Sequence, residues 1–297
     1  SAGDLTGCHF TSNALWASAS ASTQLGGGAI ACQGELPLII SSSRFDSNAA
    51  LGSHGGGILV DGCPLILSSS AFSAHSGDFG AAVFASATSL LSIDSSNFTS
   101  NTAEKSGGAC YSSFSRGSVT QSLFELNVAQ TGAALAAFDS ELTLMSSTFR
   151  ENAASIGGGA IFYDATTAFD SNTARPVFTV SSTSSDPAEL SFVSNSAPYG
   201  ADVATAGSSL SVLQGPILPL FDQFPGNYSV DRTQGQTSNQ PLQPSFLLAL
   251  TDNEASEVVR SDDSSQITVA VSNTQLSLRG PTIVQLARRV FDLLSFD

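Results

Sequence analysis

A short run of small residues followed by one apolar residue recurs along the first half of the chain. Each copy has glycine or alanine at its first three positions and Ile, Val, Leu or Cys at the fourth. The copies begin at Gly27, Gly55, Gly80, Gly107, Gly132 and Gly158, with steps of 28, 25, 27, 25 and 26 residues. Self-similarity at such a period is typical of a solenoid, in which one supersecondary unit is stacked repeatedly.

A second element, Phe-x-x-Asn, recurs out of phase with the first. Its complete copies are Phe10/Asn13, Phe45/Asn48, Phe98/Asn101, Phe124/Asn127, Phe149/Asn152 and Phe192/Asn195. Phe72 keeps the phase, but His75 stands where Asn is expected. Because imidazole also donates and accepts hydrogen bonds, we expect His75 to replace one rung of an amide ladder. The interval from Phe149 to Phe192 is longer than one period.

Short β-type runs lie between these markers, and helical periodicity is absent. Leu38–Ile40 and Leu65–Leu67 are examples, bounded by Gly, Ser and Pro. A unit of about 26 residues with three short strands is the size of one turn of a parallel β-helix. Its strands pair with their equivalents in the next turn, ~4.8 Å away. We therefore predict an all-β fold in which residues 1–210 form a parallel β-helix of about seven coils.

The two markers have structural roles in this fold. Glycine and alanine allow a tight corner and close backbone approach. The phenylalanines are expected to point inward and stack, burying about 150–250 Å² each. The asparagines are expected at corners, in left-handed backbone geometry, with their amides hydrogen-bonded between coils. The predicted structural ladder consists of Phe45, Phe72, Phe98, Phe124, Phe149, Asn48, Asn101, Asn127 and Asn152.

This pair of motifs resembles the repeats of the chlamydial polymorphic outer-membrane proteins. The resemblance covers residues 6–207, and Asn195–Gly207 resembles the motif that closes such arrays. It implies a right-handed β-helix on a cell surface, used for adhesion or as a rigid stalk. Similar repeats occur in large surface proteins of algae and protists. Arginine outnumbers lysine nine to one, which is typical of a GC-rich genome and favours such a source.

The pattern changes after the repeats. Residues 211–226 are proline-rich and are predicted to be a linker or cap. Over residues 227–297, short strand-like runs at Phe246–Leu250, Ile267–Val271 and Leu276–Leu278 predict a small, truncated β-sandwich. The final segment resembles the closing strands of immunoglobulin-like or filamin-like repeats. A helix that begins at Pro281 is the alternative for this segment.

Composition excludes several classes of partner. The net charge is −15 and only 12% of residues are charged, so no basic patch exists to neutralise nucleic-acid phosphates. No apolar run approaches the ~20 residues that span a bilayer, so we expect no direct membrane insertion by this segment.

Cysteines and sequons favour an extracellular location. The chain has four cysteines, Cys8, Cys32, Cys63 and Cys110, without a Cys-x-x-Cys pair. This suits an oxidising compartment better than a zinc site, although buried free thiols are the simpler alternative. Three full disulfide pairings exist, and Cys32 with Cys63, in comparable segments of adjacent coils, is favoured first. Asn97 and Asn227 lie in glycosylation sequons.

Catalytic and cofactor sites are not indicated. Acidic residues are dispersed through the repeats, and the three histidines have no spacing relation to a Ser or Cys nucleophile. No metal or cofactor site is therefore predicted. Acidic turns at Asp252/Glu254 and Asp262/Asp263 allow at most a weak Ca²⁺ contact, and solvated turns are the simpler interpretation.

These observations favour a non-catalytic extracellular scaffold within a larger cell-surface or filamentous assembly, such as an algal or protist flagellar or coat fibre. Its expected partners are other copies or other modules of that assembly. One alternative is an adhesin that binds a host receptor or glycan through the insertion Tyr163–Glu189. A second is a β-helical polysaccharide lyase or hydrolase.

Overall fold

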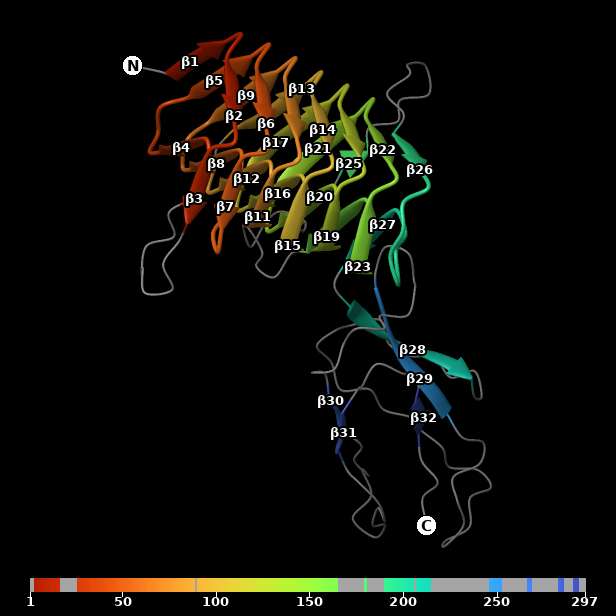
Figure 1. The fold of residues 1–297 in the computed structure, drawn as a ribbon. Helices are drawn as coiled ribbons and strands as arrows, with labels where there is room; N and C mark the ends of the chain where they lie inside the picture. Colours follow the sequence, from red (N-terminus) through yellow and green to blue (C-terminus); the bar gives the residue numbers. More distant parts are fainter. Residues whose placement is uncertain are drawn as a thin grey trace, which may run out of the picture. The chain divides into compact units, whose positions relative to one another are not determined.

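The structure is a computed structural model that describes residues 3–16, 26–88, 90–164, 179–180, 190–205, 207–214, 246–252, 266–268, 283–285 and 291–293. Within these residues all regular structure is β-strand. The chain divides into two compact units, Ser1–Thr205 and Ala206–Asp297. In the first unit, short strands are stacked in columns like the rungs of a ladder (Figure 1).

Four parallel sheets, here named A to D, build the first unit. Sheet A contains β1 (Gly3–Thr6), β5 (Leu38–Ser41), β9 (Leu65–Ser68), β13 (Leu91–Asp94), β17 (Arg116–Thr120), β21 (Glu141–Met145) and β25 (Thr179–Val180). Sheet B contains β2 (His9–Thr11), β6 (Arg44–Asp46), β10 (Ala71–Ser73), β14 (Asn97–Thr99), β18 (Leu123–Glu125), β22 (Thr148–Arg150) and β26 (Ser191–Val193). Sheet C contains β3 (Ala14–Trp16), β7 (Ala49–Leu51), β11 (Ser76–Phe79), β15 (Thr102–Ser106), β19 (Val128–Thr131) and β23 (Ala153–Gly157). Sheet D contains β4 (Ile30–Gln33), β8 (Ile58–Asp61), β12 (Val83–Ser86), β16 (Cys110–Ser113), β20 (Leu135–Phe138), β24 (Ile161–Asp164) and β27 (Val203–Thr205).

The chain passes through the four sheets in order and then begins the next turn. Strands β5–β8 through β21–β24 make about five complete turns, with a partly described turn at each end. This confirms the predicted parallel β-solenoid. The prediction of three strands per turn is wrong, because each turn has four. The missed strands form sheet C, whose inward positions, such as Ala50, Gly77 and Ala103, are alanine or glycine and so give no apolar alternation in the sequence.

Side chains that point into the solenoid form continuous columns. Sheets A and D supply aliphatic columns, and sheet B supplies the phenylalanines. In sheet C the paired positions Ala50, Gly77 and Ala103 carry almost no side chain, so this side packs more thinly. The core therefore runs along the whole solenoid, since each buried side chain contacts its equivalents in neighbouring turns.

The corner between sheets C and D explains the glycine that opens each small-residue run. Gly80 has φ +54°, and a Cβ atom there would lie 2.3 Å from the carbonyl oxygen of Val83. Gly132 repeats this geometry, with φ +56° and 2.4 Å to the carbonyl oxygen of Leu135. A side chain at either position would both strain the backbone and collide with it.

The expectation that each ladder asparagine has left-handed backbone geometry is wrong. The residue before it is left-handed instead, as at Ser47 (φ 54°), Ser100 (φ 57°) and Leu126 (φ 56°). The preceding residue makes the turn, which leaves the asparagine side chain buried and free to bond between turns.

The second unit contains antiparallel strands. β28 (Gly207–Gln214) pairs with β29 (Phe246–Asp252), which pairs with β32 (Phe291–Leu293). β30 (Gln266–Thr268) pairs with β31 (Ile283–Gln285). The alternative of one helix from Pro281 is wrong, since β31 and β32 lie in that stretch. The sandwich stays a prediction. Of the predicted linker at 211–226, residues 211–214 lie in β28, and residues 215–226 lie outside the described residues, as does Leu276–Leu278.

Candidate interaction surface

The phenylalanines of sheet B form one stacked column. Ring centroids of successive turns lie 4.5 Å apart for Phe45 and Phe72, 5.1 Å for Phe72 and Phe98, 4.8 Å for Phe98 and Phe124, and 5.0 Å for Phe124 and Phe149. Phe10 and Phe192 extend the column at its two ends, at 4.7 and 5.3 Å. The five central rings are fully buried, so they hold the turns together and are not available to a ligand.

A directional amide ladder runs beside this column. The backbone N–H and the side-chain Nδ2 of Asn101 both donate to Oδ1 of Asn127, at 3.0 and 2.9 Å. Nδ2 of Asn127 then donates to Oδ1 of Asn152 and to the carbonyl oxygen of Phe98, both at 3.0 Å. Oδ1 of Asn127 and Oδ1 of Asn152 therefore each accept two hydrogen bonds from the preceding turn, and the ladder has a fixed polarity.

His75 occupies one rung of this ladder. Its ring atom Nδ1 accepts a hydrogen bond from the backbone N–H of Asn48, at 3.0 Å. The backbone N–H of His75 donates to Oδ1 of Asn101, also at 3.0 Å. Its Nε2 is buried and has no hydrogen-bond partner among the described residues. Burial lowers the pKa of His75 from 6.5 to about 4. In its neutral form the side chain links two turns through the acceptor Nδ1, and it does so less completely than an amide because Nε2 has no partner among the described residues.

We expect acid to destabilise the solenoid through His75. Above about pH 6.5 the residue is neutral in both states, but as the pH falls toward 4 only the unfolded chain takes up the proton. The free energy of unfolding should therefore decrease by up to about 3 kcal/mol across this window. Urea titrations at several pH values measure this, with the His75→Asn variant as the matched control. Equal acid sensitivity in the two proteins would contradict the prediction.

A serine ladder, which sequence reasoning missed, lies two residues before each of the five central phenylalanines. The N–H of Ser70 donates to Oγ of Ser96 at 3.2 Å, and the N–H of Ser96 donates to Oγ of Ser122 at 3.1 Å. Each hydroxyl also donates to the carbonyl oxygen two residues earlier, at 2.8 Å for Ser70. The fuller motif is Ser-x-Phe-x-x-Asn. This serine recurs at a fixed place in the sequence, but the many other serines of the chain make its recurrence hard to recognise.

The cysteines have three different environments. Cys32 and Cys63 form a disulfide between successive turns, with Cα atoms 6.1 Å apart. Cys110 is buried in the aliphatic column of sheet D, and burial raises the pKa of its thiol. Cys8 occupies the serine position of the first turn, where its N–H donates to Oγ of Ser43 at 3.1 Å. Only one of the two disulfides of a full pairing is therefore present among these residues.

Removing the disulfide should lower the free energy of unfolding by about 2–3 kcal/mol. The cross-link joins residues separated by 31 positions, but the backbone already pairs the two turns, which places the effect in the lower part of the usual range. Urea unfolding of the Cys32→Ser/Cys63→Ser variant measures the loss. Cys8→Ser is the control, because Cys8 is not in the disulfide and stands in a serine position.

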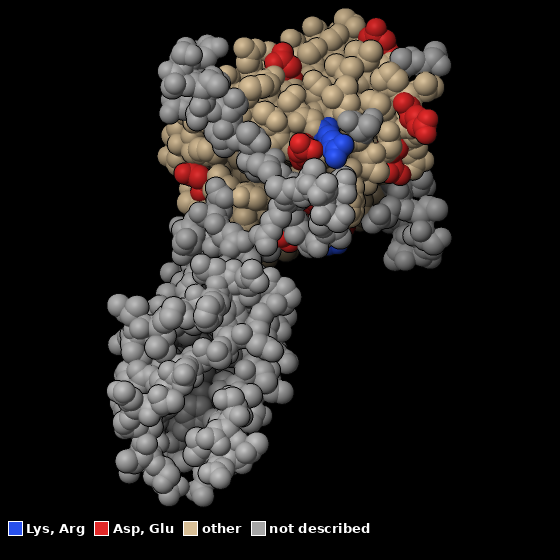
Figure 2. Space-filling model, turned by 180° about the vertical axis from the view of Figure 1, so that it is seen from behind, with Lys and Arg blue, Asp and Glu red and all other residues tan. Residues whose placement is uncertain are grey.

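Charged side chains are dispersed over the described surface. In Figure 2 the acidic residues appear as separate spots on the visible face. Arg44 pairs with Asp46 at 2.9 Å, and Arg150 pairs with Glu125. Among the described residues, no group of three or more His, Cys, Asp and Glu side chains is placed to hold a metal ion. The turns at Glu254 and Asp262/Asp263 lie outside the described residues.

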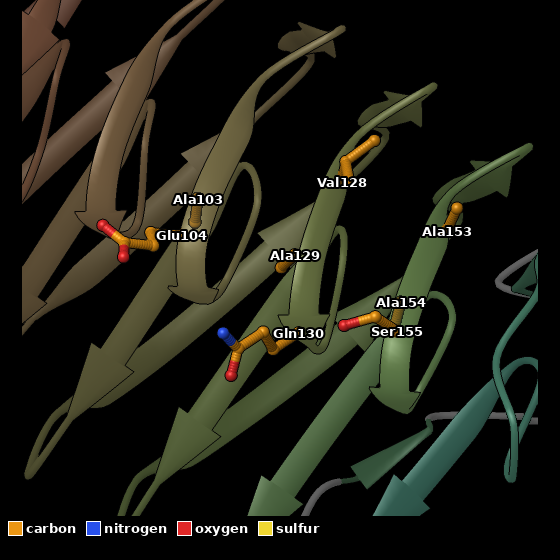
Figure 3. A pocket seen from close by; sticks show the side chains of 8 residues that line it. All are labelled: Ala103, Glu104, Val128, Ala129, Gln130, Ala153, Ala154 and Ser155. Atoms are coloured by element: carbon orange, nitrogen blue, oxygen red, sulfur yellow. The ribbon is translucent and has the colours of Figure 1, made fainter.

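A shallow groove of about 350 Å³ lies on sheet C. Figure 3 shows Ala103, Ala129 and Ala154 on neighbouring strands, with Glu104, Gln130 and Ser155 projecting in a common direction. Glu104 is the one charged lining group of the groove, so it lacks the paired carboxylates that glycoside hydrolysis requires.

A second aromatic column lies on the outer side of sheet D and was also missed. Centroids of Phe84 and Tyr111 lie 5.2 Å apart, and Phe138 follows Tyr111 at 5.5 Å. His54 stacks on Phe84 at 4.7 Å, and burial lowers its pKa. The rings cover one another's faces, so they strengthen contacts between turns rather than offering a flat platform to a sugar.

The structure describes the asparagine of one of the two sequons. Asn97 is exposed on β14, beside the buried Phe98, and is accessible to a glycosyl group. Asn227 lies outside the described residues, as does most of the insertion Tyr163–Glu189.

Within the described part of the chain, no helix is long and apolar enough to cross a membrane.

Two segments, residues 95–113 and 146–164, match the family model of the Chlamydia polymorphic membrane protein repeat. This confirms the predicted resemblance for these segments. Each covers one Ser-x-Phe-x-x-Asn motif and the following Gly-Gly-Ala run, and so spans β14–β16 or β22–β24. No curated protein and no solved structure matches the chain.

Proposed function

We propose that the chain is a non-catalytic surface module whose stiff solenoid serves as a scaffold within a larger extracellular assembly. The observation that carries this proposal is the continuous stack of phenylalanines across successive turns, with the amide ladder beside it in which His75 replaces one asparagine. Stacked repeats bury a continuous core, and their interfaces add along the axis. A stiff unit of this kind is suited to holding other modules of an assembly at a fixed distance. It is less suited to an activity that requires the protein to close around a substrate.

The repeat match supports a surface location. Repeats of a polymorphic membrane protein family are found at residues 95–113 and 146–164, in two separate turns of the solenoid. Ser92 and Ser118 are polar, uncharged side chains at paired outward positions of sheet A. A disulfide joins two turns, which suits an oxidising compartment.

Labelling of intact source cells tests the location. An antibody against the solenoid should bind cells that have not been permeabilised, and brief protease treatment of those cells should remove the signal. An antibody against a cytosolic protein is the control and should bind only after permeabilisation. Labelling of the solenoid that also requires permeabilisation would contradict the proposal. Release of unsaturated oligosaccharides from polyuronates by the purified chain would assign a lyase instead.

A further inference from the structure

Asn97 is the one asparagine in the described part of the chain that the amide ladder does not use. Each of the others donates a hydrogen bond from Nδ2 to another asparagine or to a backbone carbonyl, namely Asn13, Asn48, Asn101, Asn127, Asn152 and Asn195. The Asn97 side chain is exposed and makes no hydrogen bond with a described residue. Its backbone N–H donates to the carbonyl oxygen of Ser70 at 2.9 Å, so the backbone holds the strand while the amide group stays in solvent.

The position before each phenylalanine of sheet B has no common residue. It holds His9, Arg44, Ala71, Asn97, Leu123, Thr148 and Ser191 in successive turns. These positions face outward, because the phenylalanine that follows each of them points into the core. Packing between the turns therefore does not account for the asparagine at position 97.

Asn97 is the first residue of the triplet Asn97-Phe98-Thr99, which fills strand β14. Residues two apart on a strand face the same side, so the Asn97 amide and the Thr99 hydroxyl both lie on the outer surface of sheet B. Asn-x-Thr is the acceptor triplet for N-linked glycans, which occupy protein surfaces. The residues paired with Asn97 in the turns on either side are Ala71 and Leu123. Both are uncharged and aliphatic, so they leave room for a sugar and offer it apolar surface.

The rest of this face is suited to contact with water. Arg44 pairs with Asp46 two turns before Asn97, and Arg150 pairs with Glu125 in the turns that follow it. These charged side chains are partly exposed, so a glycan at Asn97 would extend from a surface that is already hydrated.

We propose that Asn97 carries an N-linked glycan. An oligosaccharyltransferase would join Nδ2 of Asn97 to the anomeric carbon of an oligosaccharide that is carried on a polyprenyl diphosphate. The bond from that carbon to the diphosphate oxygen breaks, the amide loses one proton, and polyprenyl diphosphate leaves, so no oxidant or reductant is needed. The inference rests on the proposed function in taking the chain through a secretory route.

Protein isolated from source cells gives the direct test. Trypsin cleaves after Arg44 and Lys105, so Asn97 lies in the peptide between them. Asn227 lies beyond Arg150 and falls in another peptide. Peptide N-glycosidase in heavy-oxygen water converts a glycosylated asparagine to an aspartate that carries the heavy isotope. Mass spectrometry of the reduced, digested protein should find this mark at position 97, and a peptide found only with unmarked asparagine would overturn the proposal.

Variants of the full chain, secreted from eukaryotic cells in culture, test the triplet itself. Wild type should carry a glycan on the peptide that contains Asn97, and Thr99→Ala should lose it. Thr102→Ala is the matched control, because it makes the same change at an exposed strand position three residues later and keeps the triplet. His9→Asn, added to Thr99→Ala, rebuilds Asn-Phe-Thr at the equivalent place of the first turn and should restore a glycan there.

Two results with these variants would refute the proposal. One is a wild-type chain without a glycan, produced beside a His9→Asn/Thr99→Ala chain that has one. The other is a glycan at position 97 that survives Thr99→Ala. A chain that is labelled on intact source cells but has unmodified Asn97 would refute this inference alone. Labelling that requires permeabilisation would contradict the proposed function, so the two proposals fail separately.

Discussion

Replacing Phe98 with alanine is expected to lower the free energy of unfolding by about 4–5 kcal/mol. The ring is fully buried and stacks on Phe72 at 5.1 Å and on Phe124 at 4.8 Å. Its loss would leave a cavity between three turns and remove two aromatic contacts, which places the effect at the high end for such a substitution. Urea denaturation followed by circular dichroism measures the change.

Phe10→Ala is the matched control for this variant. Among the described residues Phe10 stacks on Phe45 alone, and it is only partly buried, so its loss should cost clearly less. In a solenoid, stability is approximately the sum of the turns and their interfaces, and a central defect weakens two interfaces. Equal losses for the two variants would show that the column is not the source of stability.

Replacing Asn127 with aspartate is expected to destabilise the solenoid by about 4 kcal/mol or more at neutral pH. Asn127 is fully buried, and its Nδ2 donates to Oδ1 of Asn152 and to the carbonyl oxygen of Phe98. A carboxylate would aim an oxygen at those two acceptors and bury an uncompensated charge. Part of the loss should be recovered in acid, where the protonated carboxyl can again donate.

Asn97→Asp is the control, because it makes the same chemical change at an exposed position of sheet B. We expect it to change the free energy of unfolding by no more than about 0.5 kcal/mol. The same urea titrations compare the two. A similarly small effect at Asn127 would mean that the amide ladder contributes little.

The repeat markers made the solenoid predictable from the sequence. Phe45, Phe72 and Phe98 are spaced by one period, and such spacing brings equivalent residues together whatever the details of the turn. Sheet C was not predictable, because its inward positions, such as Ala50, Gly77 and Ala103, carry alanine or glycine in place of the large apolar side chains that mark a strand. The left-handed residues before the ladder asparagines were not predicted, for a different reason. Their identity varies from Ser47 to Leu126, so the sequence carries no common signal for them.

Features that depend on contacts between turns also could not be predicted from the sequence. The second aromatic column joins Phe84 and Tyr111 from one strand position to Phe138 from another, so no fixed spacing reveals it. Asp202 accepts a hydrogen bond from Nδ2 of Asn195, seven residues earlier, and stands at the third position of the corner Gly200–Val203, where the other copies carry glycine or alanine. Both contacts can be recognised only when the path of the chain through the turns is known.

His75 also has a mechanical consequence. Because the bonds between turns run along the axis, a pulling force on the two ends loads every interface in series, and the weakest one fails first. The turns on either side of His75 lack the side-chain amide bond that joins Asn101 to Asn127, while the Cys32–Cys63 disulfide ties the first two turns covalently. Rupture under tension should therefore start beside His75 and leave the aromatic stack on each side intact.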